Sequence, residues 1–127
     1  MTMRVLLVDD SAAFIVAARR LLEREGLQIV ATATTGAEAL EKALEVSPDV
    51  SLVDIDLGAE SGFDVVRSLH ESAGGPFRTV LISSHSPEDF ADLVAESAAV
   101  GFVSKSRLSA AAIREVLDGG SSSTPQT

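Results

Sequence analysis

The stretch SLVDIDLG (residues 51–58) decides the predicted fold, because an apolar run ends there in two aspartates, Asp54 and Asp56. The whole run, at 50–55, has the length of a strand and lacks regular polar alternation. Such continuous hydrophobicity is typical of a strand covered on both faces, as in a parallel sheet between helices. Similar runs recur along the chain at 4–8, 27–33, 79–83 and 101–104. The sequence therefore predicts a five-stranded parallel sheet.

Signals for helix starts separate these runs. Thr35 is followed three residues later by Glu38, which is the pattern of a capping box. Ser86 precedes Pro87, a cap followed by proline at the first helical position. The weaker signals are three cap candidates and one helix stop: Ser11, Ser61, Ser109 and Gly119. Helices are therefore expected after each strand.

Five strand–helix units predict an α/β domain with a doubly wound sheet of flavodoxin-like order 2-1-3-4-5, helices on both faces and right-handed crossovers. The chain of 127 residues is long enough to bury one sizeable core. We expect this domain over residues 1–118. The remaining stretch, GGSSSTPQT (119–127), has no apolar periodicity, so it predicts a flexible tail or the beginning of a linker.

The composition excludes several classes of protein. Because the chain has no cysteine, disulfides, thiolate metal sites and cysteine nucleophiles are excluded. Nineteen acidic residues against ten Lys and Arg give a net charge of -9, which repels nucleic acid, so no direct nucleic-acid binding by this chain is expected. No apolar run is long enough for a signal-peptide core or a membrane span. We therefore expect a soluble, cytoplasmic protein without membrane contact.

Polar residues follow four of the predicted strands at one edge of the sheet. Asp9 and Asp10 follow the first strand, and Asp54 ends the third. Ser83 ends the fourth strand, and Lys105 follows the fifth. In open sheets of this kind, ligands bind beyond the carboxyl ends of the strands, where the first and third strands are neighbours. Each residue alone has an ordinary explanation, such as a helix cap or a surface lysine, but together they indicate a site.

The residue types in this cluster favour a metal ion and a phosphoryl group. Mg²⁺ prefers oxygen ligands, takes one or two carboxylates and leaves room for a phosphoryl oxygen. A lysine adds positive charge for the same group. Without a cation, three neighbouring carboxylates repel one another, and at least one should resist ionisation. The sequence therefore predicts a Mg²⁺ site at this edge.

Four motifs carry a resemblance to a known family. They are LLVDDS (6–11), PDVSLVDIDLGAESG (48–62), VLISSH (80–85) and GFVSKS (101–106). In this combination the chain resembles the receiver domains of two-component response regulators, the CheY-like superfamily, up to about residue 117. The form KSRLS (105–109) is closest to receivers of the NarL/LuxR type.

The resemblance implies a role for each residue of the cluster. Asp54 would be the phosphoacceptor, which receives a phosphoryl group from a sensor histidine kinase or a phosphotransfer protein. Mg²⁺ would be held by carboxylates and one backbone carbonyl: Asp9, Asp10, Asp54 and the carbonyl of Asp56. Ser83 and Lys105 would bind the phosphoryl oxygens, and Phe102 would be the aromatic switch residue. Such a domain is a phosphoacceptor switch, which catalyses only its own phosphorylation and dephosphorylation.

The resemblance also implies partners and shows departures from the family pattern. A homodimer could form through the fourth helix, fifth strand and fifth helix, and receivers of this type usually carry a C-terminal helix-turn-helix, which is outside this chain. Gly58 stands where the family usually has proline, and glycine predicts a more mobile loop. Ser106 also replaces a common proline, so we expect a trans peptide bond after Lys105.

Asp56 and His85 are candidates for tuning dephosphorylation. Asp56 lies two residues after Asp54, and His85 lies two residues after Ser83 on the exit loop of the neighbouring strand. The two side chains could face each other across the mouth of the site and control access of the attacking water. The alternative is that both are unpaired, solvent-exposed loop residues.

Two other functions remain open at this point. The motif DID also resembles the D-x-D motif of haloacid dehalogenase-like phosphatases, but an acidic pair should then follow the lysine, whereas only Glu115 and Asp118 do so. A receiver-like interaction module that is not phosphorylated is the second alternative. The presence of Asp54 and its four partner residues argues against that module.

Overall fold

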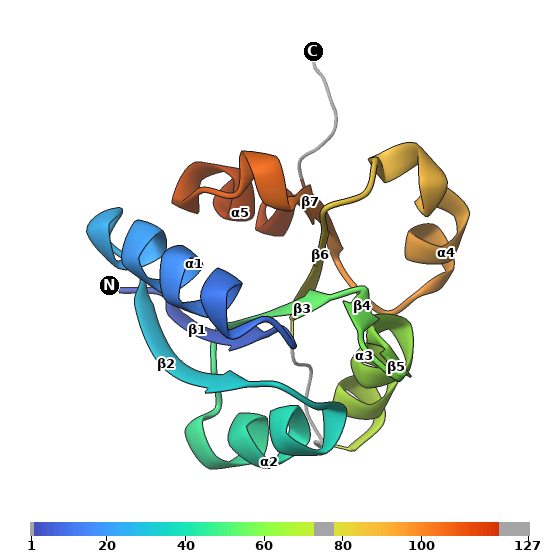
Figure 1. Ribbon diagram of the computed structural model, residues 1–127, viewed down its shortest axis with the longest axis horizontal. Helices are drawn as coiled ribbons and strands as arrows, with labels where there is room; N and C mark the ends of the chain where they lie inside the picture. Colours follow the sequence, from blue (N-terminus) through green and yellow to red (C-terminus); the bar gives the residue numbers. More distant parts are fainter. Residues whose placement is uncertain (1, 73–77, 120–127) are drawn as a thin grey trace.

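The chain folds around one central parallel sheet. This computed structural model describes residues 2–72 and 78–119. The five strands are β1 (Arg4–Val8), β2 (Gln28–Ala33), β3 (Val50–Asp54), β6 (Thr79–Ser83) and β7 (Gly101–Ser104). They lie in the order β2-β1-β3-β6-β7, and every neighbouring pair is parallel (Figure 1). Because β6 and β7 are the fourth and fifth predicted strands, the predicted order 2-1-3-4-5 is confirmed.

Helices cover both faces of this sheet, as predicted. The helices are α1 (Ala12–Arg24), α2 (Gly36–Val46), α3 (Gly62–Ser72), α4 (Ala91–Glu96) and α5 (Ala110–Leu117). Buried side chains of α1 and α5 pack on one face, and those of α2 and α3 pack on the other (Figure 1). The central strands β3 and β6 are buried at every residue. Burial on both faces explains why these strands read as continuous apolar runs.

Alternation along β1 shows how one strand serves two cores. Val5 and Leu7 join the cluster below α1 and α5, whereas Leu6 and Val8 join the cluster below α2 and α3. Successive side chains of a strand point to opposite faces, so one short apolar run fills both layers. The hydroxyl of Ser51 in β3 is buried without a hydrogen-bond partner among the described residues.

Most predicted helix caps are present. The side-chain oxygens of Ser11, Thr35 and Ser109 each accept a hydrogen bond from the backbone N–H three residues later. The capping box at Thr35 is displaced, because the Glu38 carboxylate accepts from the N–H of Thr34 at 2.8 Å. The side chain of Ser61 accepts from the N–H of Phe63 at 3.2 Å. Gly119 ends α5 with a φ of +85°, as a helix stop requires.

The prediction that a helix begins at Ser86 and Pro87 is wrong. That segment forms only a 3-10 turn, η1 (Pro87–Asp89), and α4 begins four residues after Pro87. The Ser86 hydroxyl binds the Glu88 side chain instead of a backbone N–H. Phe90, with φ -127° and ψ 9°, breaks the helical path while its ring packs near Phe63 and His85. Local capping chemistry was therefore overridden by aromatic packing.

A small hairpin after β3 was not predicted. Its strands are β4 (Asp56–Leu57) and β5 (Glu60–Ser61), which pair in antiparallel fashion. Gly58 makes the turn with a φ of +66°, a conformation that glycine adopts readily. The hairpin holds Asp56 beside the end of β3.

Two further sequence predictions concern the backbone and the tail. No cis peptide bond occurs within 2–72 or 78–119, so the bond after Lys105 is trans, as predicted. The same described part of the chain contains no helix that is long and apolar enough to cross a membrane. Of the predicted tail, 119–127, all but Gly119 lies outside the described residues.

Candidate functional site

The sheet register brings the predicted site residues to one edge. Val8 is paired with Val53, so Asp9 and Asp54 follow at the same level of adjacent strands. Ser83 pairs with Ser104 across β6 and β7, and Lys105 begins the 3-10 turn η2 (Lys105–Arg107) immediately afterwards. Parallel strands end at a common edge, which explains how residues far apart in sequence converge there.

Three carboxylates form the centre of the site. Asp9, Asp10 and Asp54 each offer one oxygen, and these oxygens lie within 4.8 Å of one another. Asp9 and Asp54 are buried, whereas Asp10 is exposed. Backbone N–H groups orient the two buried carboxylates: Ser11 donates to Asp9 at 2.8 Å, and Asp56 donates to Asp54 at 3.2 Å. Backbone hydrogen bonds thus fix the carboxylates of Asp9 and Asp54, while Asp10 is accessible to solvent.

Lys105 joins the two buried carboxylates. Its Nζ lies 2.7 Å from Asp9 Oδ2 and 3.1 Å from Asp54 Oδ2. Burial alone would lower the pKa of Lys105, but the hydrogen bonds to Asp9 and Asp54 and the negative charges of these carboxylates together raise that pKa above its ordinary value. The ammonium group therefore stays charged at the point where the carboxylates converge.

The environment opposes ionisation of Asp54. Burial is the largest cause that raises its pKa above the ordinary value of an aspartate, and the nearby Asp9 carboxylate raises it further. The backbone N–H of Asp56 and the Lys105 ammonium act in the opposite direction without cancelling the shift. One carboxylate does resist ionisation, as the sequence predicted, but the main cause is desolvation rather than repulsion.

The donor set fits a hard divalent cation. Carboxylate oxygens are the ligands that Mg²⁺ prefers, and here three of them meet at one open edge. Asp9 Oδ2 is buried, and the Lys105 ammonium lies 2.7 Å from it. Two or three negative charges shared by one lysine leave a local excess of negative charge. A cation bound beside Asp10 would offset this excess.

Phe14 is a site residue that the sequence did not reveal. Its ring on α1 lies below Lys105, with 4.2 Å between Nζ and the ring centroid. A cation over an aromatic face is attracted by the ring quadrupole, and the ring restricts where the ammonium can lie. Phe14 is otherwise an apolar residue on the face of α1 that packs on the core, so nothing in the local pattern distinguishes it.

If this domain is phosphorylated as the family resemblance implies, we expect Phe14→Leu to slow that reaction about twofold to tenfold, because leucine keeps apolar bulk but removes a contact worth about 0.5–1 kcal/mol or slightly more. Phe14→Tyr should restore the rate, since it keeps the aromatic face. The measurement is the rate of phosphoryl incorporation for both variants at matched thermal stability. Equal rates in the two variants would show that Phe14 only fills space.

Asp56 and His85 lie together beside the cluster. His85 Nε2 is 3.4 Å from Asp56 Oδ2, and both side chains are more than half exposed, at 54% and 68%. Both residues are exposed, as the alternative expected, but they are paired, so the unpaired part of that alternative is wrong. The His85 ring makes an edge contact with Phe90 at a centroid distance of 5.7 Å, and Phe90 lies 6.4 Å from Phe63. Aromatic packing thus holds the imidazole at the mouth of the site.

The two predicted switch residues occupy different positions. Ser83 is buried at the end of β6, and its hydroxyl accepts a hydrogen bond from the backbone N–H of His85 at 3.0 Å. Phe102 on β7 is partly buried and packs against the core below α2 and α3. Their roles in phosphoryl binding and switching stay predictions.

The sequence of this chain is similar to those of known proteins. The family profile of the response regulator receiver domain matches residues 5–118. A candidate transcriptional regulator of Pseudomonas aeruginosa is 38% identical over 102 residues, which are 80% of this chain and 49% of that protein. Protein-glutamate methylesterase/protein-glutamine glutaminase 5 of Myxococcus xanthus is 41% identical over 104 residues, which are 80% of this chain and 30% of that protein.

A solved structure agrees with these relatives. The two-component response regulator of the LuxR family from Aurantimonas sp. SI85-9A1 superimposes with a TM-score of 0.81 at 30% identity, and the match covers 93% of this chain and 84% of that chain. The fold and the acidic site define a doubly wound switch-type domain of two-component signalling. The chain belongs to the response regulator receiver domain family. This membership leaves the phosphatase alternative without support.

Proposed function

We propose that Asp54 accepts a phosphoryl group in a Mg²⁺-dependent reaction and that the domain thereby switches an output surface. The observation that carries this proposal is the Lys105 ammonium between Asp9 and Asp54, at 2.7 and 3.1 Å. A buried acid beside a charged lysine and two further carboxylates can bind a cation and a phosphoryl group together. A histidine kinase or phosphotransfer protein is the proposed donor, and the cytoplasm is the proposed location.

The chain's own residues account for most of the chemistry. An oxygen of the Asp54 carboxylate attacks phosphorus, and the bond from phosphorus to the donor's leaving group breaks as the new P–O bond forms. Lys105 donates hydrogen bonds and positive charge to the transferred oxygens. Asp9, Asp10 and Asp54 would hold Mg²⁺, with the Asp56 carbonyl as a further ligand, and the bound ion would supply charge neutralisation.

The switch would begin at Ser83. Its hydroxyl oxygen accepts from His85, so its own proton is available to a phosphoryl oxygen on Asp54. Movement of Ser83 toward that group would open space for Phe102, whose ring is only partly buried. Phosphorylation would then bias one of two arrangements of β7 and its neighbours. A homodimer through α4, β7 and α5, or a helix-turn-helix in a longer protein, would receive this signal.

The proposed function is tested by asking whether the chain gains one covalently bound phosphoryl group, and whether this gain requires Mg²⁺. The chain is incubated with acetyl phosphate, either with Mg²⁺ or with EDTA, and its intact mass is measured. One phosphoryl group should be gained with Mg²⁺ only, and fragmentation should locate it to Asp54. Absence of the adduct would favour the interaction module that is not phosphorylated, and an adduct elsewhere would reject the assigned acceptor.

A second prediction concerns the pair of Asp56 and His85. Because the two groups are 3.4 Å apart beside the acceptor, we propose that they control access of the water that hydrolyses the acyl phosphate. Loss of phosphate is measured in the wild type, in Asp56→Asn, in His85→Ala and in the double variant. The single variants should change the lifetime, and the double variant should not equal the product of the single effects. Four equal lifetimes would show that Asp56 is only a turn residue with no effect on dephosphorylation.

A further inference from the structure

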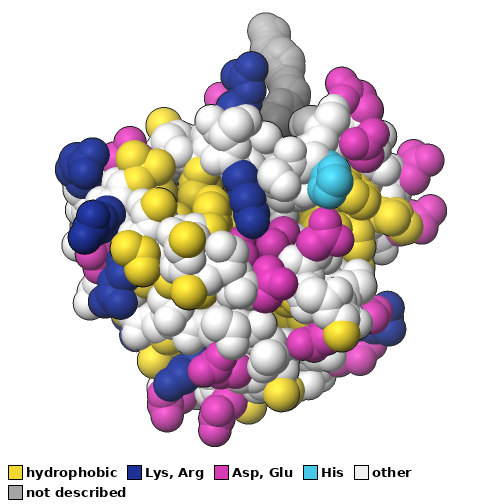
Figure 2. Space-filling model, in the orientation of Figure 1, with side chains coloured by type: hydrophobic (Ala, Val, Ile, Leu, Met, Phe, Trp, Pro, Cys, Tyr) yellow, Lys and Arg dark blue, Asp and Glu magenta, His cyan; other side chains and the backbone are white. Residues whose placement is uncertain are grey.

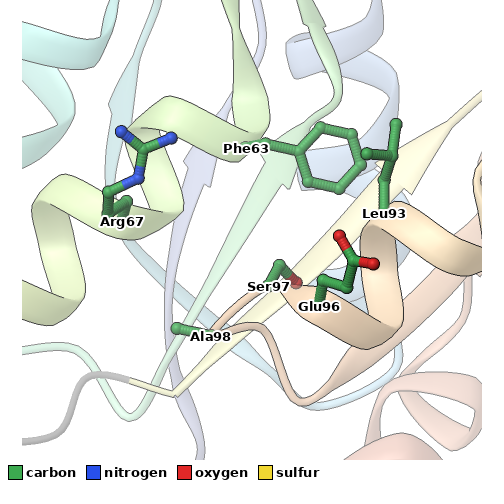
Figure 3. Close-up of a pocket in the computed structure, with 6 residues that line it drawn as sticks. All are labelled: Phe63, Arg67, Leu93, Glu96, Ser97 and Ala98. Carbon is green, nitrogen blue, oxygen red and sulfur yellow. The ribbon is translucent and has the colours of Figure 1, made fainter.

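A pocket of about 410 Å³ lies between α3 and α4, outside the aspartate cluster. Its lining residues are Phe63, Arg67, Leu93, Glu96, Ser97 and Ala98. Figure 3 shows the Phe63 ring and the Leu93 side chain pointing toward each other from the two helices, with the Glu96 carboxylate beside them. This volume accommodates one large apolar side chain or a small ligand.

The α4 wall of this pocket is poorly covered by the rest of the domain. No residue of α4 is buried, and Leu93 keeps 51% of its surface exposed. Leu93 and the neighbouring Phe63 ring leave apolar surface of the pocket in contact with water, which is unfavourable in free energy. A bound partner would remove this surface from water. The pocket therefore has the apolar part of a docking site.

The charge on the α4 side of this pocket is one-sided. Between Arg78 and Lys105 the chain contains four acidic residues and no lysine or arginine: Glu88, Asp89, Asp92 and Glu96. Acidic side chains are visible along the edge of the molecule where α4 lies (Figure 2). Arg67 is neutralised by Asp64 at 2.8 Å, whereas Asp92 and Glu96 form no ion pair with any described residue. The α4 side of the pocket is thus negative, with Glu96 in the lining and Asp92 one turn earlier on the same helix.

We propose that the α3–α4 pocket binds a basic segment of a partner protein, which inserts one aromatic or leucine side chain between Phe63 and Leu93. Lysine or arginine residues of that segment would lie against Asp92 and Glu96. Charge complementarity favours this occupant, because a symmetric contact with a second copy would place acidic rim against acidic rim. Nucleic acid would be repelled by the same rim.

This pocket shares α4 with the surface proposed to carry homodimerisation, but it lies on the α3 side of that helix. Every lining residue comes from α3, from α4 or from the turn after it, and none comes from β7 or α5. Binding there would not require phosphorylation, so the proposal can fail while the proposed function holds, and the reverse is also true.

The test uses a synthetic helical peptide of lysine and alanine with one central phenylalanine, and a control peptide with alanine in place of phenylalanine. Binding to the unphosphorylated chain is followed by fluorescence anisotropy and by amide chemical shifts in NMR spectra. We expect shifts concentrated at Phe63, Leu93 and Ala98, and an affinity at least about tenfold lower for the control peptide, because it lacks the side chain that fills the pocket.

Matched variants decide whether the pocket is responsible. Leu93→Ser should weaken peptide binding about tenfold, whereas Leu44→Ser on α2, where the leucine is 54% exposed, should leave it unchanged. Glu96→Gln removes one rim charge without removing the apolar wall, and it should reduce the dependence of affinity on salt. Equal effects of Leu93→Ser and Leu44→Ser, shifts concentrated away from α3, α4 and the turn after α4, or self-association of the chain through this face would overturn the proposal.

Discussion

Asp54→Asn is expected to abolish incorporation of a phosphoryl group from acetyl phosphate and from any cognate kinase, because an amide cannot act as the nucleophile. The variant should keep the fold. The ionised form of Asp54 is opposed by burial, and Lys105 retains Asp9 as a partner at 2.7 Å. The measurement is the intact mass after incubation with donor and Mg²⁺, together with thermal unfolding of both proteins.

The matched control for this variant is Asp56→Asn, which changes the other aspartate of the opening stretch. Asp56 is 68% exposed and contributes a backbone N–H to Asp54, and the substitution keeps that N–H. Incorporation into Asp56→Asn should persist. Loss in both variants would mean that the two aspartates act as a unit, and undiminished incorporation into Asp54→Asn would move the acceptor to another residue.

Gly62→Ala is expected to give the largest loss of stability of any single substitution considered for this chain. A Cβ at Gly62 would lie 2.1 Å from the carbonyl oxygen of Asp54 and 2.8 Å from the Cα of Ile55. Both contacts are with backbone, so no side chain can move aside. The expected loss is about 3 kcal/mol or more in the free energy of unfolding, measured by urea denaturation.

Gly26→Ala is the control for Gly62→Ala, because it measures the cost of a left-handed backbone conformation without steric crowding. Gly26 has a φ of +96°, but a Cβ there meets nothing within 4 Å. Its expected cost is about 1–2 kcal/mol, from the left-handed conformation alone. Similar losses in the two variants would show that the junction of β5 and α3 relaxes away from Asp54 and that the close approach is not a constraint.

The sequence predicted the features that depend on local chemistry. The apolar runs marked all five strands of the large sheet, and the caps at Ser11, Thr35 and Ser109 were predicted from residues within a single turn. Each of these signals arises from side chains and backbone groups that are close in sequence. The edge at which the acidic residues meet followed from the topology alone.

The features that were missed depend on contacts between distant residues. The start of α4 was predicted at Pro87 because the capping pattern is local, but the position of Phe90 depends on Phe63 from another helix. Phe14 and Lys105 are brought together by α1 and the turn after β7, so their contact leaves no local pattern. The roles of Asp56, Ser83 and Phe102 remain predictions, because they concern a phosphorylated state.

The parallel arrangement of the sheet also has a consequence for how the chain acquires its activity. Each pair of neighbouring strands is joined through a crossover, so no pair can form from a simple hairpin. Asp9 stands at the start of the chain, while Lys105 reaches it only after β7, the last strand, has paired with β6. Such non-local pairings form slowly during folding. A chain in which β7 has not yet paired with β6 therefore lacks the lysine that completes the site, so competence to receive a signal depends on that non-local pairing.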